Sequence, residues 1–241
     1  MSVALVTGAS RGLGLALAGG LADAGWSLIV DARHAEPLQE AVRELRSRAA
    51  PGASVVAHVG SVADPQHRRE LIAAAEDLGG LDLLVNNAGI LGPSPLPALE
   101  RLELAAYREI LEIGTVAPLA LAQLALPLLR RSPRGALINV TSDAAVEAYA
   151  GWGGYGSGKA ALEQWSRVLA TELTEAGSDV KVWWVDPGDL RTQMHQDAFP
   201  GEDISDRPLP DTVVPGFLRL ISERPPSGRF RAAALLEGAP A

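Results

Sequence analysis

The chain has 241 residues, of which 47% are hydrophobic and 21% charged, a composition typical of a folded globular protein rather than a disordered one. Its formal net charge of −8 leaves no basic surface to neutralise phosphates, so we expect no nucleic-acid partner. The lack of cysteine excludes disulfide bonds and thiol chemistry, and favours a cytoplasmic location.

Short apolar runs alternate with longer helical patterns along the chain. The first run follows the N-terminus directly, so we expect no signal peptide. Near-continuous apolar strands separated by helices predict a parallel sheet covered on both faces, which is a Rossmann-type doubly wound α/β fold in a single domain over 1–241. The predicted strands are 3–7, 27–31, 54–59, 81–87, 135–142 and 180–186, with a seventh near 228–232, and the predicted helices are 12–24, 35–50, 64–79, 100–131 and 156–177.

Three segments need a separate interpretation. The uncharged stretch 113–129 contains a glutamine and two prolines and falls short of the ~20 apolar residues that cross a membrane, so we interpret it as a helix buried against the sheet and a partner subunit. The segment 189–211, rich in Pro, Asp and Gly, follows the sixth strand and is expected to cover a substrate, the alternative being a plain surface loop. We expect a loose tail over 234–241.

The glycine-rich segment Thr7–Gly14 lies between the first strand and the first helix. Its spacing, Gly-x-x-x-Gly-x-Gly, differs from a Walker A motif, which requires Gly-Lys-Ser/Thr. Glycines at such a turn let backbone N–H groups approach an anion, to which the helix N-terminus adds its dipole. Glycine turns also arise from packing alone, but this placement favours a dinucleotide site.

The end of the second strand bears on which dinucleotide binds. A carboxylate there would bond the adenosine ribose hydroxyls, whereas an arginine accommodates a 2′-phosphate. The chain offers both Asp31 and Arg33, which point the same way because side chains alternate along a strand. Arg11 in the glycine segment adds a second cation, and two guanidiniums suit a phosphate dianion. We therefore favour NADP(H) over NAD, although either arginine alternatively pairs with Asp31 or lies on the surface.

Together these motifs resemble the short-chain dehydrogenase/reductase family over roughly residues 2–195. Thr7–Gly14 resembles its cofactor motif, Asn-Asn-Ala-Gly at 86–89 its fourth-strand motif, and Tyr155–Lys159 its Tyr-x-x-x-Lys motif. Ser142 stands thirteen residues before Tyr155, where the family has its catalytic serine. The resemblance implies Ser142, Tyr155 and Lys159 as catalytic residues, and places Arg33 where NADP-preferring members often have a basic residue. The cofactor-binding residues that it implies are Gly8, Ser10, Arg11, Gly12, Leu13, Gly14, Arg33, Ser61, Val62, Asn87, Ala88, Gly89, Tyr155, Lys159, Pro187, Gly188, Leu190 and Thr192.

The chemistry of the Tyr-x-x-x-Lys motif follows from its charges. A phenol with a pKa of about 10 is a poor base near neutral pH. The ammonium of Lys159, one helical turn away on the same face, is expected to lower the pKa of Tyr155 towards the working range. As in the family, Lys159 would also bond the nicotinamide ribose and Ser142 would hold the substrate oxygen. The glycines at 153, 154, 156 and 158 are expected to leave room for a bulky substrate.

Two positions depart from the family pattern. Ser61 stands where an aspartate usually contacts adenine, and Gly114 stands where many members have an asparagine that completes a catalytic tetrad. Glycine keeps the backbone carbonyl that holds a relay water but loses the side chain that props a kinked helix, so we expect a kink near Pro118. Neither Glu112 nor Thr115 is an obvious replacement.

The predicted function is therefore an NADP(H)-dependent oxidoreductase that interconverts a ketone or aldehyde and an alcohol. Because of Gly114, the alternative is a cofactor-binding protein with little or no turnover, serving as a sensor or partner subunit. The four histidines show no metal-ligand spacing, and we propose no metal site. His195 is expected to contact substrate or to be exposed. Apolar faces on 100–131 and 156–177 predict a homodimer or homotetramer, with a small-molecule substrate and no membrane partner.

Overall fold

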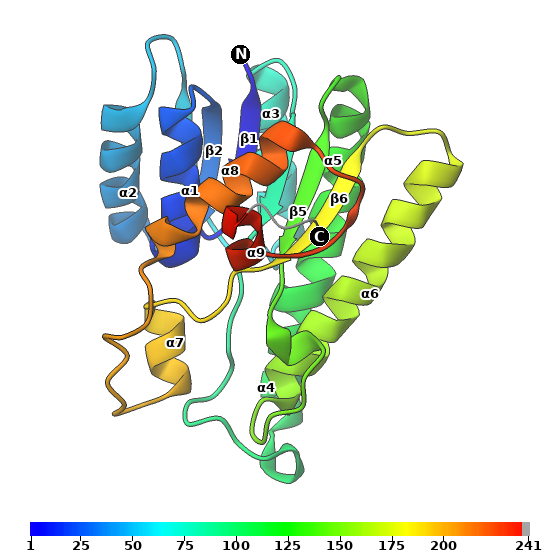
Figure 1. The fold of residues 1–241 in the computed structure, drawn as a ribbon. Coiled ribbons are helices and arrows are strands. Elements are labelled where there is room, and N and C mark those ends of the chain that lie inside the picture. Colours follow the sequence, from blue (N-terminus) through cyan, green and yellow to red (C-terminus); the bar gives the residue numbers. More distant parts are fainter. Residues whose placement is uncertain (238–241) are drawn as a thin grey trace.

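The computed structural model describes residues 1–237 and has an all-parallel sheet of seven strands in the order β3-β2-β1-β4-β5-β6-β7 (Figure 1). This confirms the predicted doubly wound fold, including its seventh strand. The strands are β1 (Val3–Val6), β2 (Ser27–Ala32), β3 (Val55–Val59), β4 (Leu83–Asn86), β5 (Ala136–Val140), β6 (Lys181–Asp186) and β7 (Gly228–Arg231).

Helices cover both faces of the sheet (Figure 1). Side chains alternate along a strand, so in β1 Ala4 and Val6 pack with α1, α2 and α8, whereas Val3 and Leu5 pack with α3, α5 and α6. Both faces are therefore buried, which explains the near-continuous apolar strands. The main helices are α1 (Gly12–Asp23), α2 (Ala35–Arg48), α3 (Pro65–Asp77), α4 (Leu104–Leu111), α5 (Ala117–Arg131), α6 (Gly153–Glu175), α7 (Gln193–Ala198), α8 (Val214–Glu223) and α9 (Ala232–Glu237).

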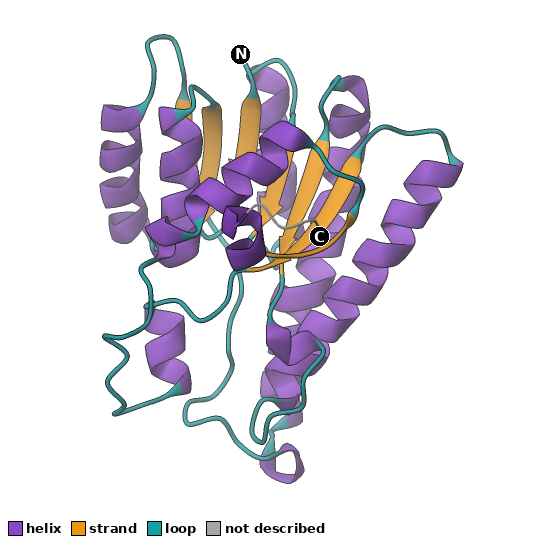
Figure 2. Ribbon diagram, viewed as in Figure 1, coloured by secondary structure: helices purple, strands orange, loops and turns teal. Residues whose placement is uncertain are grey.

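The carboxyl ends of all strands meet at one edge of the sheet. Below that edge in Figure 2 lie long loops together with α4 and α7. Strand β1 is flanked by β2 and β4, so consecutive connections leave it in opposite directions. In open α/β sheets a ligand binds in the crevice at this reversal of strand order.

The predicted helix 100–131 is divided into several pieces. A 3-10 turn, η1 (Leu99–Arg101), precedes α4, and a π-helical turn, η2 (Glu112–Val116), joins α4 to α5. The continuous part, Leu104–Arg131, has the length and the apolar composition of a membrane-spanning helix. Core helices of soluble proteins often have the same length and composition. Its most apolar window is 44% buried, so part of its apolar surface is uncovered in the single chain.

Two irregular segments contain more structure than expected. The segment 189–211 includes α7, whose N-cap Thr192 accepts a hydrogen bond from the backbone N–H of His195. The predicted loose tail is corrected over 234–237, because α9 begins directly after β7 and packs against α8. Residues 238–241 of that tail lie outside the described residues.

Candidate active site

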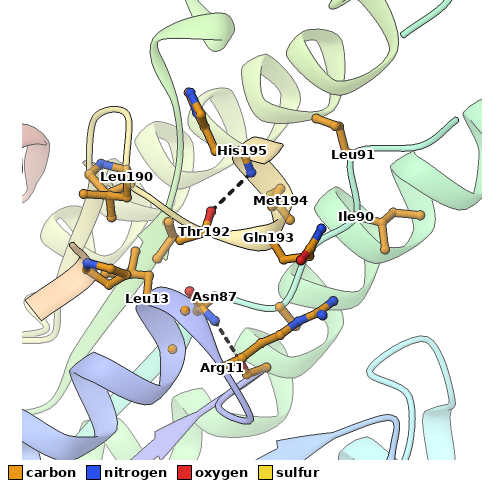
Figure 3. Close-up of a pocket in the computed structure, with 18 of the residues that line it drawn as sticks. Arg11, Leu13, Asn87, Ile90, Leu91, Leu190, Thr192, Gln193, Met194 and His195 are labelled. Atoms are coloured by element: carbon orange, nitrogen blue, oxygen red, sulfur yellow. Dashed lines mark hydrogen bonds between the residues drawn. The ribbon is translucent and has the colours of Figure 1, made fainter. Parts of the chain in front are cut away.

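A cleft of about 820 Å3 opens at the carboxyl edge of the sheet. Figure 3 shows the start of α7 facing Arg11 across it, with Ile90 and Leu91 at the side. The cleft brings together every site residue predicted from the sequence: Gly8, Ser10, Arg11, Gly12, Leu13, Gly14, Arg33, Ser61, Val62, Asn87, Ala88, Gly89, Ser142, Tyr155, Lys159, Pro187, Gly188, Leu190 and Thr192.

The glycine segment forms one wall of the cleft in a conformation that requires glycine. Gly8 and Gly12 have φ values of +67° and +57°, and a Cβ on Gly14 would lie 2.4 Å from both the Gly8 carbonyl oxygen and Asn87 Nδ2. Asn87 Nδ2 donates to the carbonyls of Thr7 (2.8 Å) and Gly8 (3.2 Å), which fixes the loop against β4 (Figure 3). Helix α1 begins without a side-chain cap, so its first N–H groups point towards the cleft as an anion site.

The carboxylate of Asp31 supports this loop from behind. Asp31 is 1% exposed, and its Oδ1 accepts from the backbone N–H of Gly8 at 2.7 Å. Its Oδ2 lies 2.9 Å from Nε2 of the buried His67, and Gly60 leaves the space that the imidazole occupies, because a Cβ there would lie 2.2 Å from His67 Nδ1. Both carboxylate oxygens are therefore engaged inside the protein. Sequence reasoning missed the His67 partner, because 36 residues separate it from Asp31.

The two arginines predicted to bind a phosphate are exposed at the adenosine end of the cleft. Within residues 1–237 neither Arg11 nor Arg33 forms an ion pair, so the alternative pairing with Asp31 is not observed. Ser61 lines the same end, and its Oγ accepts from the N–H of Ala63 at 3.2 Å, which leaves its hydroxyl proton available. Within the described part of the chain, this end thus presents two guanidiniums without an ion pair, together with a hydroxyl donor.

The three predicted catalytic residues lie at the other end of the cleft. Lys159 is buried, donates from Nζ to the carbonyl of Val140 at 2.7 Å, and has its Nζ 5.5 Å from the ring centre of Tyr155. Burial lowers the pKa of Lys159 to about 8, against the opposing attraction of Glu163. Ser142 donates from Oγ to Asp143 Oδ1 at 3.0 Å, so its hydroxyl is already oriented by a neighbouring carboxylate.

The electrostatics of Tyr155 differ from the expectation. Burial of the phenol, followed by the negative charges of Asp186 and Asp143, raises the pKa of Tyr155 above its usual value. The predicted lowering by Lys159 is therefore not found for the protein alone. The physical reason is that the loss of water around the phenol and the two nearby carboxylates all oppose its ionisation, while the Lys159 ammonium bonds a backbone carbonyl.

The glycines around Tyr155 make room for protein rather than for substrate. A Cβ on Gly153 would lie 2.5 Å from Leu99, and one on Gly156 would lie 2.5 Å from the carbonyl oxygen of Ala144. A Cβ on Gly154 would approach Leu102 to 2.9 Å. The prediction of space for a bulky substrate at these positions is thus wrong. The glycines let α6 pack closely against the segments before α4 and after β5.

The substrate side of the cleft has an aromatic wall. Trp152 contacts Tyr155, with ring centres 5.8 Å apart, and Phe199, with ring centres 5.9 Å apart. The imidazole of His195 stacks on Phe199 at 4.9 Å and is 9% exposed, so the histidine is not the exposed residue that one alternative expected. Within the described chain its Nε2 is buried without a hydrogen-bond partner. This wall therefore combines apolar rings with one unsatisfied polar atom.

The chain is similar in sequence to proteins of one known family. Residues 2–203 match the family model described as short chain dehydrogenase. The chain belongs to the short-chain dehydrogenase/reductase family. It is 35% identical over 195 residues to the human (Homo sapiens) protein "Dehydrogenase/reductase SDR family member 2, mitochondrial", a match that covers 80% of this chain. The chain spans just under two thirds of that relative's length, 66%.

Solved structures of family members superpose closely on the chain. One from Pseudomonas syringae, assigned to the short chain dehydrogenases, has a TM-score of 0.88 at 32% identity and covers 96% of this chain and 94% of its own. Another from Shigella flexneri, solved in complex with NADP, has a TM-score of 0.88 at 28% identity and covers 96% and 97%. A member of the short-chain dehydrogenase/reductase family with this fold therefore binds NADP.

The structure accommodates Gly114, the main departure from the family pattern. Gly114 lies in the π-helical turn η2, which ends two residues before Pro118, and a Cβ built on it would meet nothing within 4 Å. Thr115, which sequence reasoning set aside, donates from Oγ1 to the carbonyl of Gly158 at 2.9 Å. The turn is thus tied to α6 beside Lys159 by a hydroxyl one position away from the family's asparagine.

Proposed function

We propose that the chain is an NADP(H)-dependent oxidoreductase that interconverts a ketone or aldehyde and an alcohol. The observation that carries the proposal is that Ser142, Tyr155 and Lys159 line the same cleft as a glycine loop with two unpaired arginines among the described residues. The first N–H groups of α1 suit the pyrophosphate, and Arg11 and Arg33 suit the 2′-phosphate. Asp31, the carboxylate that would favour NAD, is held inside the protein by Gly8 and His67.

The chemistry divides between the cofactor and the chain. When bound, NADP(H) supplies or accepts the hydride. Tyr155 gives the carbonyl oxygen a proton in reduction and removes it in oxidation, while Ser142 orients that oxygen. Lys159 has one donor on Val140, which leaves two N–H groups for the ribose hydroxyls of the cofactor and places a positive charge over the phenol.

The substrate pocket favours an apolar or aromatic carbonyl compound with one further polar group. Trp152, Leu91 and Met194 provide the apolar surface, with Phe199 packed against Trp152, and His195 Nε2 provides a buried polar atom without a partner among the described residues. Leaving such an atom unpaired is unfavourable, so a substrate that bonds it gains both affinity and orientation.

Turnover with NADPH on a panel of aromatic and aliphatic ketones tests the proposal. Tyr155→Phe should keep the fold and NADPH binding while turnover falls by about 10²–10⁴-fold, because only the transferable proton is lost. Tyr107→Phe is the matched control, since that phenol accepts from Ser157 Oγ at 3.2 Å and does not line the cleft. Near-normal turnover in Tyr155→Phe on a confirmed substrate would assign the acid to another group.

A second function is favoured by two specific observations. Gly114 replaces the family's asparagine, and the pKa of Tyr155 is raised rather than lowered. Both favour a protein that binds the cofactor with little or no turnover and acts as a sensor or partner subunit. NADPH binding, seen as a change in nucleotide fluorescence, with no turnover on any carbonyl of the panel would support this second function and overturn the first.

A further inference from the structure

Arg229, on the edge strand β7, joins the two segments that carry the proposed catalytic residues to the end of β6. Its Nε donates to Glu163 Oε1 on α6 at 2.9 Å, and its Nη2 donates to the backbone carbonyl of Ser142 at 3.2 Å. The same Nη2 lies 3.4 Å from Asp186 Oδ2 at the end of β6. One side chain outside the family's motifs therefore bridges α6, the loop after β5 and the end of β6.

The direction of the side chain follows from the sheet. Arg229 is paired in register with Trp184, which packs on the face covered by α6, and parallel neighbours point to the same face. Arg229 therefore reaches across the end of β6 to α6. No local pattern in the sequence around β7 indicates this contact, because Glu163 is 66 residues away.

Both carboxylates that Arg229 contacts support a functional segment. Glu163 lies one helical turn after Lys159, has a side chain only 4% exposed, and also accepts from Thr141 Oγ1 at 2.8 Å. Asp186 accepts from the N–H of Gly188 through Oδ1 at 3.0 Å, which shapes the turn that lines the cleft. A planar guanidinium can bond these groups and the Ser142 carbonyl together, whereas a lysine ammonium is a point charge on a flexible stem.

We infer that Arg229 is a positioning residue for the reaction, which holds the backbone of Ser142 and the carboxylate beside Lys159 in one rigid arrangement. Arg229 has no contact with substrate in this role and acts through the two catalytic residues. The inference rests on the proposed function, because it presumes that Ser142 and Lys159 act on a carbonyl and a cofactor. Misplacing a reacting group by about 1 Å costs on the order of 10²-fold in rate, which is the scale of effect at stake.

The test compares Arg229→Met with Arg231→Met by steady-state kinetics on a ketone that the wild-type protein reduces. Arg231 is the matched control, because it lies two residues along the same strand, is exposed and does not line the cleft. In Arg229→Met we expect kcat to fall by about tenfold or more, with the ketone KM and the NADPH Kd, measured by fluorescence, within about threefold. Arg231→Met should match the wild type.

A purely structural role predicts a different pattern. If Arg229→Met lowers the melting temperature but keeps kcat within about twofold well below that temperature, the inference is wrong. If Arg229→Met does not fold, Arg229→Lys decides, since a lysine keeps the charge beside Glu163 but not the simultaneous bond to Ser142. We expect Arg229→Lys to fold and lose several-fold in kcat, and wild-type kcat in that variant overturns the inference.

A double-mutant cycle separates action through Glu163 from a general effect. Glu163→Gln and Arg229→Met should give effects on kcat that do not add, because both remove the same ion pair. Full additivity would contradict the coupling. Failure of the proposed function is distinct, since the wild-type protein would then bind NADPH yet reduce no ketone of the panel.

Discussion

Asp31 and Arg33 stand two residues apart at the end of β2, and the structure gives them different tasks. Asp31 is buried on Gly8 and His67, whereas Arg33 is exposed at the cleft. A carboxylate that supports the loop from behind leaves the ribose side to the arginines. We propose that cofactor choice at this position depends on which of the two side chains finds a partner inside the protein.

This arrangement predicts that Arg33→Ala weakens the binding of NADPH but not that of NADH. A hydrogen bond to a charged group contributes roughly 1.5–3 kcal/mol, so the NADPH Kd should rise by about tenfold or more. The NADH Kd should stay nearly unchanged, because NADH has no 2′-phosphate. Titration of both nucleotides by fluorescence measures the two constants, with Arg43→Ala, an exposed arginine on α2, as control. Equal weakening of both cofactors in Arg33→Ala would rule out the phosphate contact.

Lys159 gives a prediction about pH that needs no substrate. Burial lowers its pKa from 10.5, the value of a free lysine, to about 8, so in the cofactor-free protein its ammonium should lose its proton at lower pH. The unfolded chain then binds more protons between about pH 8 and 10.5, so the contribution of Lys159 makes the free energy of unfolding rise with pH in that window. The catalytic role that we propose for Lys159 requires the charged form and should weaken as pH rises above about 8.

Competitive acetylation at a series of pH values, followed by peptide mass spectrometry, measures this pKa. The experiment is clean because Lys181 is the only other lysine of the chain and serves as the internal reference. Glu163→Gln should move the midpoint for Lys159 to lower pH, because the attraction that opposes burial is lost. A wild-type midpoint near that of a free lysine would contradict the effect of burial.

At the scale of elements, the π-helical turn η2 contains Gly114, which replaces the family's asparagine, and Pro118 follows shortly after it. In an α-helix the carbonyl of residue 114 would accept from the N–H of residue 118, but Pro118 has no N–H. The Gly114 carbonyl is therefore without its α-helical donor. Near Pro118, where we expected a kink, the structure has this π-helical turn, and we propose that the carbonyl of Gly114 holds the relay water behind Lys159.

The substitution Gly114→Asn distinguishes two interpretations: that the Gly114 carbonyl suffices to hold the relay water, or that the natural protein is an impaired enzyme without the asparagine. The space around a Cβ at 114 is open, and replacing a helical glycine removes a cost of roughly 0.5–1 kcal/mol, so the melting temperature should rise slightly. Turnover should change by no more than about tenfold, since the carbonyl is retained. Gly114→Ala is the control for helix propensity alone. A gain of several orders of magnitude in Gly114→Asn but not in Gly114→Ala would show that the natural protein lacks an essential side chain.

How far the elements and the site were predictable depends on whether the cause is local. Buried parallel strands are apolar along their whole length, so β1 and its neighbours were evident, and the glycine loop was recognisable because Gly8 and Gly12 adopt positive φ. A glycine does not reveal what occupies its space, so Gly153 and its neighbours were assigned to substrate instead of to Leu99. The contacts Asp31–His67 and Glu163–Arg229 were missed because only the folded sheet brings these residues together.

At the scale of the whole molecule, an uncovered apolar surface lies on α5 and α6. A groove between these helices is lined by Leu119, Leu126, Trp165, Val168 and Leu169, and Val168 is 44% exposed. The long apolar stretch Leu104–Arg131 contributes one side of this groove through α5. We propose that a second copy of the chain covers it, because exposed apolar surface of this kind is usually buried in an interface.

The proposal predicts that the protein is an oligomer and that one charge introduced into the groove weakens the contact between its subunits. Light scattering coupled to gel filtration should give the wild-type protein a mass that is two or four times 25.2 kDa. Val168→Glu should shift the mass towards a single chain, because a two-fold interface repeats the substitution and an unpaired charge is costly to bury. Val59→Glu, at an exposed valine on the edge strand β3, should leave the mass unchanged. A wild-type monomer at all concentrations, or a Val168→Glu protein of unchanged mass, would show that the groove has another role.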